Sequence, residues 1–448
     1  MKRRFHRFAV VVIGVLAFTT LAHADLNSAE LGGGIRVRGQ YLDPVAFDDR
    51  RHADDFIEQR TRLNLNAVLT EGVNAFLEFQ SYDIYGDDFV GLRPVRLTVP
   101  EDDSGDVELY QGWLEAEKLF DYPLTVRVGR QELAYGREWL LGNRDANSLF
   151  SGLSFDTVKL RYTRGDIQID AWASKLVERR AQETDADTDF YGLYGTYGTL
   201  EELSLDTYWL FVRNAEDDTE PRADTDRLHT VGGRLFGIYR AFDYSLEGAY
   251  QFGDAAWFRR RADYDAWAID SVLGYTFDDT EWEPRLGVGM AFFSGDDDWY
   301  DDDARAFNRL FSDVEYGEIL DRRADLSNLF VFHAMARAKP IEKLKLDLKW
   351  HYYLADQDEI YLRSGSFMKR LFGSGRRELQ GAAEIGHEID VSATYDYSNG
   401  LSLRAGWAHF FADDALEDGV PLSYNGLKRR GTDDADADYF FLEGRLEF

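Results

Sequence analysis

The chain has 448 residues, a formal net charge of −31 and no cysteine. Such a negative charge argues against nucleic acid as a partner, because an acidic protein and phosphate groups repel each other. The lack of cysteine excludes disulfide bonds and thiolate metal sites. Aromatic residues make up 15% of the chain and there are only 8 prolines, a composition that favours β structure.

Residues 1–24 are expected to be a secretory signal peptide. A basic stretch at residues 2–7 precedes an apolar run at residues 8–21, and Ala22-His23-Ala24 fits a small-residue cleavage site. The mature protein would therefore work outside the bacterial cytoplasm. From residue 25 onwards no apolar run is long enough to cross a membrane as a helix.

Strand-like segments alternate with connections that are by turns short and long. The first strands are predicted at residues 30–41, 56–69, 73–84 and 107–119, and the last at residues 438–448. Short connections are predicted at residues 70–72, 121–123, 164–166, 200–202, 240–241, 278–282, 339–342 and 398–400, and long ones at 85–106, 134–153, 181–189, 214–226, 253–263, 295–325, 355–383 and 412–437. Short periplasmic turns and long extracellular loops are typical of bacterial outer-membrane barrels. We therefore expect residues 25–448 to form one domain, an all-β transmembrane antiparallel barrel of about 18 strands.

The segment at residues 343–354 indicates which face of a strand meets lipid. It places Leu344, Leu346, Leu348 and Trp350 on one face and lysines, Asp347 and His351 on the other. Placing a Lys or Arg against lipid at the bilayer midplane costs about 2–4 kcal/mol. The charged faces are therefore predicted to line a lumen.

Alternation in the other strands predicts an inner wall that is mixed in charge but rich in cations. Two explanations remain open: the charges pair with acids on neighbouring strands, or rings of Arg and Lys favour the passage of anions, with guanidinium groups suited to carboxylates. The predicted inward cations are Arg36, Arg38, Arg60, Arg62, Arg127, Lys159, Arg161, Arg234, Arg285, Lys343, Lys345, Lys349, Arg404 and Arg445, and the predicted inward acids are Glu78, Glu115, Glu117, Asp170, Asp206, Glu247, Asp347, Glu388, Asp390 and Glu443.

Signals for catalysis or bound cofactors are weak. His387-Glu388 begins a zinc-protease motif, but Val391 stands where the second histidine is needed. The aspartate runs at residues 296–298, 301–303 and 433–434 lack the spacing of a calcium-binding loop. They are solvated loops, or they bind divalent cations or help to expel an anionic product. We expect no cofactor, no metal and no enzymatic activity.

One block of the sequence resembles the alginate export porin family. It consists of Gly129-Arg130-Gln131-Glu132-Leu133, Tyr135-Gly136, Leu141-Gly142-Asn143-Arg144 and Phe155-Asp156-Thr157-Val158-Lys159-Leu160. The resemblance implies an 18-stranded outer-membrane barrel with an arginine-rich constriction, loops that gate the lumen, and passage of a secreted polyuronate. The chain has Leu153 where the family usually has a basic residue before Ser/Thr-Phe-Asp.

By this resemblance Arg130 and Glu132 would line the constriction, with Arg127 and Arg161 beside them. Strict alternation from Val126 and Val128 would instead point Arg130 at lipid. We predict a β-bulge at Gly129 that turns Arg130 inward, because glycine within a strand often marks a bulge. The loop at residues 134–153 is expected to fold inward and narrow the pore.

Together these features predict a passive outer-membrane channel that exports an anionic polysaccharide. The expected partners are the polysaccharide, outer-membrane lipids, periplasmic export proteins and, through the terminal Phe448, the barrel-assembly machinery; the barrel is expected to be a monomer. The alternatives are an anion-selective porin for small organic anions and, from another class, an outer-membrane scaffold or enzyme.

Overall fold

The computed structural model describes most of the chain that follows the predicted signal peptide. The described residues are 26–43, 53–85, 107–145, 150–177, 187–200, 202–215, 225–255, 262–297, 301–323, 326–362, 377–380, 382–418, 420, 422 and 436–448. The predicted signal peptide, nearly all of the acidic loop at 85–106, and Asp433 and Asp434 lie outside these residues.

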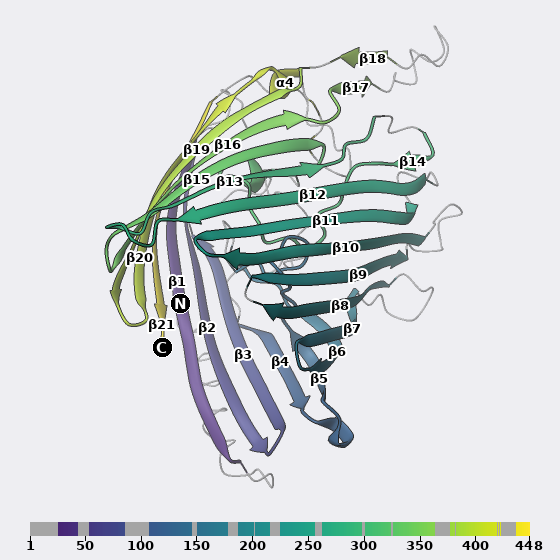
Figure 1. Cartoon of the computed structure of the whole chain (residues 1–448), viewed down its shortest axis with the longest axis vertical. Coiled ribbons are helices and arrows are strands. Elements are labelled where there is room, and N and C mark those ends of the chain that lie inside the picture. The colour runs from purple at the N-terminus through teal and green to yellow at the C-terminus, as the bar shows by residue number, and fades with distance from the viewer. Residues whose placement is uncertain are drawn as a thin grey trace.

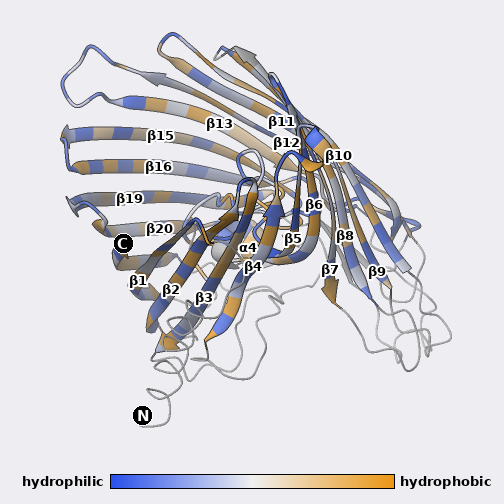
Figure 2. Cartoon of the chain, turned by 90° about the horizontal axis from the view of Figure 1, so that it is seen from below, coloured by the Kyte–Doolittle hydropathy of each residue, from blue (hydrophilic) through white to orange (hydrophobic). Residues whose placement is uncertain are grey.

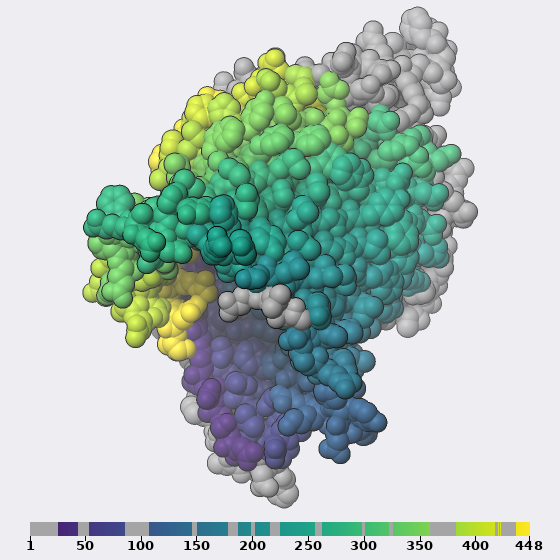
Figure 3. Space-filling view, viewed as in Figure 1, coloured from purple at the N-terminus to yellow at the C-terminus, as the bar shows by residue number. Residues whose placement is uncertain are grey.

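In the described part of the chain, eighteen antiparallel strands form a closed barrel (Figure 1). Each strand pairs with the next, and the last pairs with the first from Gly34↔Glu447 to Asp43↔Asp438, which leaves no free edge. In Figure 3 the side chains cover the surface in the same order, with the last strands beside the first. The strands are β1 (Ser28–Asp43), β2 (Asp54–Thr70), β3 (Val73–Tyr85), β4 (Glu108–Ala116), β5 (Leu124–Gln131), β6 (Phe155–Arg164), β7 (Ile167–Val177), β8 (Thr188–Leu200), β9 (Leu203–Ala215), β10 (Thr225–Tyr239), β11 (Phe242–Ala255), β12 (Ala262–Thr276), β13 (Arg285–Phe293), β15 (Leu329–Ile341), β16 (Leu344–Ala355), β19 (Glu384–Ser398), β20 (Leu401–Ala412) and β21 (Ala437–Glu447).

The remaining elements are short and lie in the connections. They are the 3-10 turn η2 (Leu119–Asp121), β14 (Asp303–Ala304), α2 (Leu320–Arg323), the hairpin of β17 (Glu359–Leu362) and β18 (Arg377–Gln380), and α4 (Asp414–Asp418). None of the helices in the described residues has the length and apolar character needed to cross a membrane. The predicted fold class and strand number are confirmed.

The outer face of the barrel is apolar, as the alternation predicts. On β16, Leu348 and Trp350 are 47% and 41% exposed, whereas His351 and Tyr353 on the opposite face are 4% and 0% exposed. Figure 2 shows this alternation as blue and orange blocks along the strands. A soluble protein would bury such side chains, so the apolar face is the one that meets lipid.

Aromatic side chains gather on the outer face toward the ends of the strands that lead into the long connections. Phe211 stacks on His229 with ring centroids 4.1 Å apart, and His229 on Phe252 at 5.1 Å. Further along the wall Trp267 contacts Phe292 at 4.3 Å, and Phe292 contacts Phe330 at 4.4 Å. Aromatic bands of this kind mark the membrane–water interface of outer-membrane barrels.

Two segments fold into the barrel and pack against each other. The first inward segment comprises residues 132–145 and 150–154, and the second comprises residues 294–297 and 301–323. Gly142 N donates to Phe311 O at 2.9 Å, and Trp139, 1% exposed, lies 6.1 Å from the ring of Phe293. The hydrophobic core of this barrel therefore lies inside the lumen, between the two inward segments and the wall.

Candidate functional site

A group of arginines lines the inner wall of β1 and β2. Arg36 lies in register with Arg60 on β2 and with Arg445 on β21, so three like charges are neighbours across three strands. Arg36 NH2 and Arg38 Nε both donate to Glu443 Oε2, at 3.0 and 2.7 Å. The carboxylate of Glu443 therefore binds two buried guanidinium groups.

The first inward segment supplies further partners to this group. Asp145 forms an ion pair with Arg60, and its carbonyl oxygen accepts from Arg36 NH1 at 2.7 Å. The ring of Phe150, 0% exposed, lies 4.2 Å from the Arg36 guanidinium, a cation–π contact. Burial opposes ionisation of Asp145, but the charges of Arg60 and Arg62 outweigh it and hold its pKa below the ordinary value. These contacts attach the segment to the basic wall.

Glu132, predicted to line the constriction, lies at the start of the same segment. Tyr110 OH donates to Glu132 Oε1 at 2.7 Å, Asn143 Nδ2 donates to Oε2 at 3.1 Å, and Arg62 NH1 lies 3.5 Å from Oε1. Burial raises the pKa of Glu132, and these three neighbours only partly offset it.

Arg127, Lys159 and Arg161 form a second basic group on β5 and β6. Arg127 Nε donates to Glu115 at 2.7 Å, and its guanidinium lies 3.8 Å from the ring of Trp113. Arg161 donates to both oxygens of Asp170, at 2.9 and 2.7 Å. Lys159 is 7% exposed.

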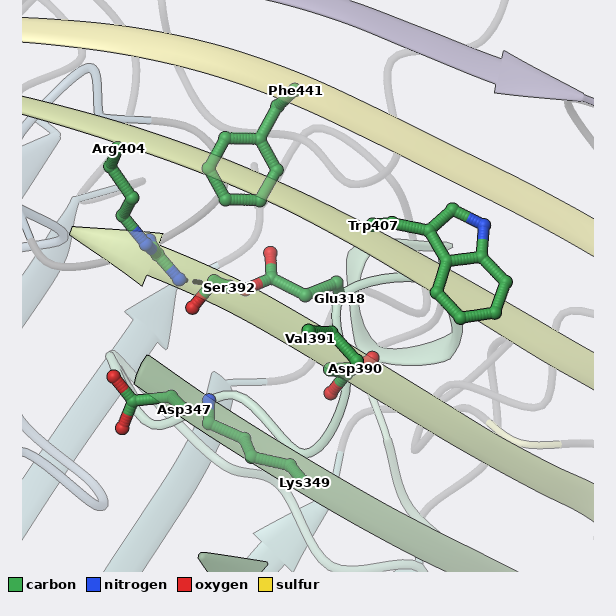
Figure 4. Close-up of a pocket in the computed structure, with 9 residues that line it drawn as sticks. All are labelled: Glu318, Asp347, Lys349, Asp390, Val391, Ser392, Arg404, Trp407 and Phe441. Carbon is green, nitrogen blue, oxygen red and sulfur yellow. Dashed lines mark hydrogen bonds and ion pairs between the residues drawn. The ribbon is translucent and has the colours of Figure 1, made fainter. Parts of the chain in front are cut away.

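The other predicted inward cations are spread round the wall, and most have an acid beside them. Arg285 Nε donates to Asp243 at 2.9 Å, Lys345 to Asp396 at 3.1 Å, Arg404 to Glu318 at 3.3 Å, and Arg445 to Glu447 at 2.8 Å. Lys349 lines a pocket with Asp347, Asp390 and Arg404 (Figure 4). Pairing with neighbouring acids, one of the two explanations offered by the sequence, thus applies to a large part of the inner wall.

The prediction that a bulge at Gly129 turns Arg130 inward is wrong. The register runs without a shift from Gly112↔Arg130 to Ala116↔Val126 and from Leu124↔Tyr162 to Gln131↔Phe155. Arg130 therefore lies on the same outer face of β5 as Val128, a residue that is 49% exposed. Its guanidinium pairs with Asp156 on β6, whose neighbours Phe155 and Thr157 are 1% and 5% exposed on the inner side. The irregularity lies one strand away, between Glu78 and Phe79 in the pairing of β3 with β4.

The second inward segment, which sequence reasoning did not single out, is hydrogen-bonded to β19 and β12. Glu388 on β19 accepts the backbone N–H groups of Glu318, Ile319 and Leu320, at 2.6, 2.8 and 3.2 Å. Asp270 on β12 accepts from Tyr316 OH and from Arg137 NH1, each at 2.5 Å. Asp270 therefore joins both inward segments to one strand. The length of the connection at residues 295–325 was the only sequence signal of this role.

Three of the described aspartates of the second inward segment share one arginine. Arg305 forms ion pairs with Asp297 at 2.7 Å and Asp301 at 2.8 Å, and a third with Asp303. Within the described residues no group of three or more His, Cys, Asp or Glu side chains is arranged to hold a metal ion.

A closed antiparallel barrel with an apolar outer face, an aromatic band and a charged lumen defines an outer-membrane channel protein. The chain matches the family model described as alginate export over residues 27–428, and it belongs to that family. The predicted resemblance is confirmed.

Solved structures of porins have the same fold. A BenF-like porin from Pseudomonas fluorescens Pf-5 matches with a TM-score of 0.58 and 11% identity, covering 95% of this chain and 100% of that one. OccAB1 from Acinetobacter baumannii matches at 0.58 and 13%, covering 95% and 98%, and OccK8 (OprE) from Pseudomonas aeruginosa at 0.56 and 12%, covering 95% and 99%. A comparison with curated proteins gave no match.

Proposed function

We propose that this barrel exports an anionic polysaccharide of the polyuronate class across the bacterial outer membrane by passive passage. Membership of the alginate export family supports the substrate class. The barrel is proposed to act as a monomer. No nucleotide-binding motif in the chain could supply a driving force, so periplasmic proteins are proposed to deliver the polymer.

The observation that carries this proposal is the cluster of four inward-facing guanidinium groups on β1 and β2. Arg36, Arg38, Arg60 and Arg62 face inward, and Glu443 and Asp145 are each within ion-pair distance of two of them. A polyuronate presents one carboxylate per sugar, and a guanidinium group binds a carboxylate through two parallel hydrogen bonds. The remaining cations further along the lumen would offer successive weak contacts, which a polymer needs in order to enter and still leave.

A second function, uptake of small organic anions, is favoured by a different observation. The two inward segments meet inside the barrel, where Leu141 and Phe311 form a parallel bridge, and they reduce the free cross-section. A passage narrowed in this way suits a single small solute as well as an extended chain.

Planar-bilayer recordings test the proposal. We expect anion-selective conductance that polymannuronate blocks and a neutral dextran of similar size does not. Arg127→Gln should weaken the block, because Arg127 faces the lumen, whereas Arg130→Gln on the outer face of the same strand is the matched control and should not. Cation selectivity would contradict both functions, and anion selectivity without a polymer block would favour small anions.

A further inference from the structure

Lys159 differs from the other cations of the basic group on β5 and β6. It lies on β6 in register with Arg127 on β5 and Trp172 on β7. The side chain is 7% exposed, and within the described residues no hydrogen bond or ion pair reaches its ammonium group. A buried ammonium without a partner is costly, because it has lost part of its hydration and gained no acceptor.

The acids near Lys159 are already engaged. Glu115 binds Arg127, with Oε2 2.6 Å from NH2. Asp170 accepts two hydrogen bonds from Arg161 and one from Tyr135 OH at 2.7 Å. Three cations therefore share two carboxylates, and the group carries one uncompensated positive charge.

Trp172, the neighbour of Lys159 on the other side, also has an unused donor. Its indole lies across Gly192, where an added Cβ would come within 2.0 Å of the ring. Its Nε1–H is buried and has no hydrogen-bond partner in the part of the chain that the structure describes. The indole leans toward β8 and its N–H can only donate, so Trp172 offers the ammonium of Lys159 no acceptor.

The other lumen lysines do not share this environment. Lys345 is paired with Asp396 at 3.1 Å. Lys349 is in register with Asp390 and lines a pocket with Asp347 (Figure 4). Lys345 therefore has an ion-pair partner and Lys349 has an acid in register on the next strand, whereas the strand neighbours of Lys159 are Arg127 and Trp172.

We propose that Lys159 is a carboxylate-binding subsite of the lumen, which takes the carboxylate of a uronate residue as it passes between Arg127 and Arg161. This inference rests on the proposed function and deepens it. The side chains of Arg127 and Arg161 are 22% and 37% exposed, so an anion in the lumen reaches the subsite between them. One carboxylate there would neutralise the excess charge and accept a hydrogen bond from the ammonium of Lys159.

The test compares Lys159→Met, which keeps the length of the side chain and removes its charge, with Lys345→Met, which removes an equal charge from a paired lumen lysine. Two probes are used in planar bilayers: an oligomannuronate and monomeric glucuronate. A hydrogen bond to a charged group contributes about 1.5–3 kcal/mol, so Lys159→Met should weaken binding of both probes roughly tenfold or more. Lys345→Met should change it far less, and Lys159→Arg should retain most of it. Heat-modifiable gel mobility verifies that each variant is folded.

The two proposals fail in different ways. Equal losses of binding in Lys159→Met and Lys345→Met, or none in either, would overturn the subsite. If the wild-type channel is not blocked by oligomannuronate, the export proposal fails, and the glucuronate measurement alone then decides the subsite: a loss confined to Lys159→Met supports it, and no such loss overturns it.

Discussion

Arg130 and Asp156 form a bidentate ion pair on the outer face of the barrel, with Nε to Oδ1 at 2.7 Å and NH2 to Oδ2 at 2.8 Å. The pair begins a row of charged residues that crosses neighbouring strands in register, from Asp156 to Lys175, Asp189 and Arg213. The next row of outward-facing residues lies two positions along each strand, toward the periplasmic end. It contains Val128 and Val158, followed by Tyr191 and Phe211 of the aromatic band. Arg130 is therefore an interfacial residue, positioned where charge meets the polar edge of the membrane.

Replacing Arg130 with alanine should leave ion selectivity unchanged and lower stability only slightly. The two side chains are 42% and 54% exposed, and an exposed ion pair contributes at most about 1 kcal/mol. A double-mutant cycle with Asp156→Ala, followed by urea unfolding in lipid vesicles, measures this coupling. Arg127→Ala is the control on the inner face and should shift the reversal potential. A similar shift in Arg130→Ala would contradict the outward placement.

Gly129→Ala should impair folding of the barrel. Gly129 has φ +131°, and an added Cβ would lie 2.2 Å from the carbonyl oxygen of Gly112 on the neighbouring strand. A non-glycine residue in such a conformation costs about 1–3 kcal/mol, and the contact with β4 adds to this cost. Gly39→Ala is the matched control, since a Cβ added at Gly39 would meet no atom within 4 Å. The fraction that refolds into detergent micelles checks the prediction; equal fractions for both variants would refute it.

Glu388→Gln should loosen the second inward segment and raise single-channel conductance. Both oxygens of Glu388 accept backbone N–H groups of residues 318–320, and an amide offers one oxygen and an N–H2 group in their place. Losing a hydrogen bond to a charged group costs about 1.5–3 kcal/mol.

Glu384→Gln is the control for this change. Glu384 lies on the same strand and, among the residues that the structure describes, its side chain accepts only from Tyr352 OH, at 3.3 Å on the outer side. Limited proteolysis of the second segment gives an independent measure. Unchanged conductance together with unchanged proteolysis in Glu388→Gln would show that Glu388 does not hold the segment.

Lowering the pH should increase anion selectivity through Glu132. Burial raises the pKa of Glu132, so as the pH falls this carboxylate takes up a proton before an ordinary glutamate does. The lumen then loses one negative charge beside Arg62, while Asp145, whose pKa is lowered, keeps its charge to lower pH. Reversal potentials measured between about pH 7.5 and about pH 4.5 should change less in Glu132→Gln than in the wild type. Equal pH responses would contradict this role.

Alternation along the strands was sufficient to predict the barrel and the two faces of its wall. A strand has a period of two, and a lipid-facing charge is costly at the midplane, so the pattern of residues 343–354 admits one orientation only. The same rule placed Arg130 outside. The family resemblance pointed to the opposite face, and the unbroken register of β5 decided for alternation.

The conformation of the two inward segments could not be predicted in this way. Connections between strands lack a repeating pattern of polar and apolar residues, and their conformation depends on partners that are distant in the sequence. Asp145 meets Arg60, and Glu388 meets residues 318–320, only after the barrel has closed and brought these strands round the same lumen. The sequence alone therefore determined which residues face inward. The tertiary structure decided which of them are compensated by acids from other strands and inward segments, and that Lys159 is not.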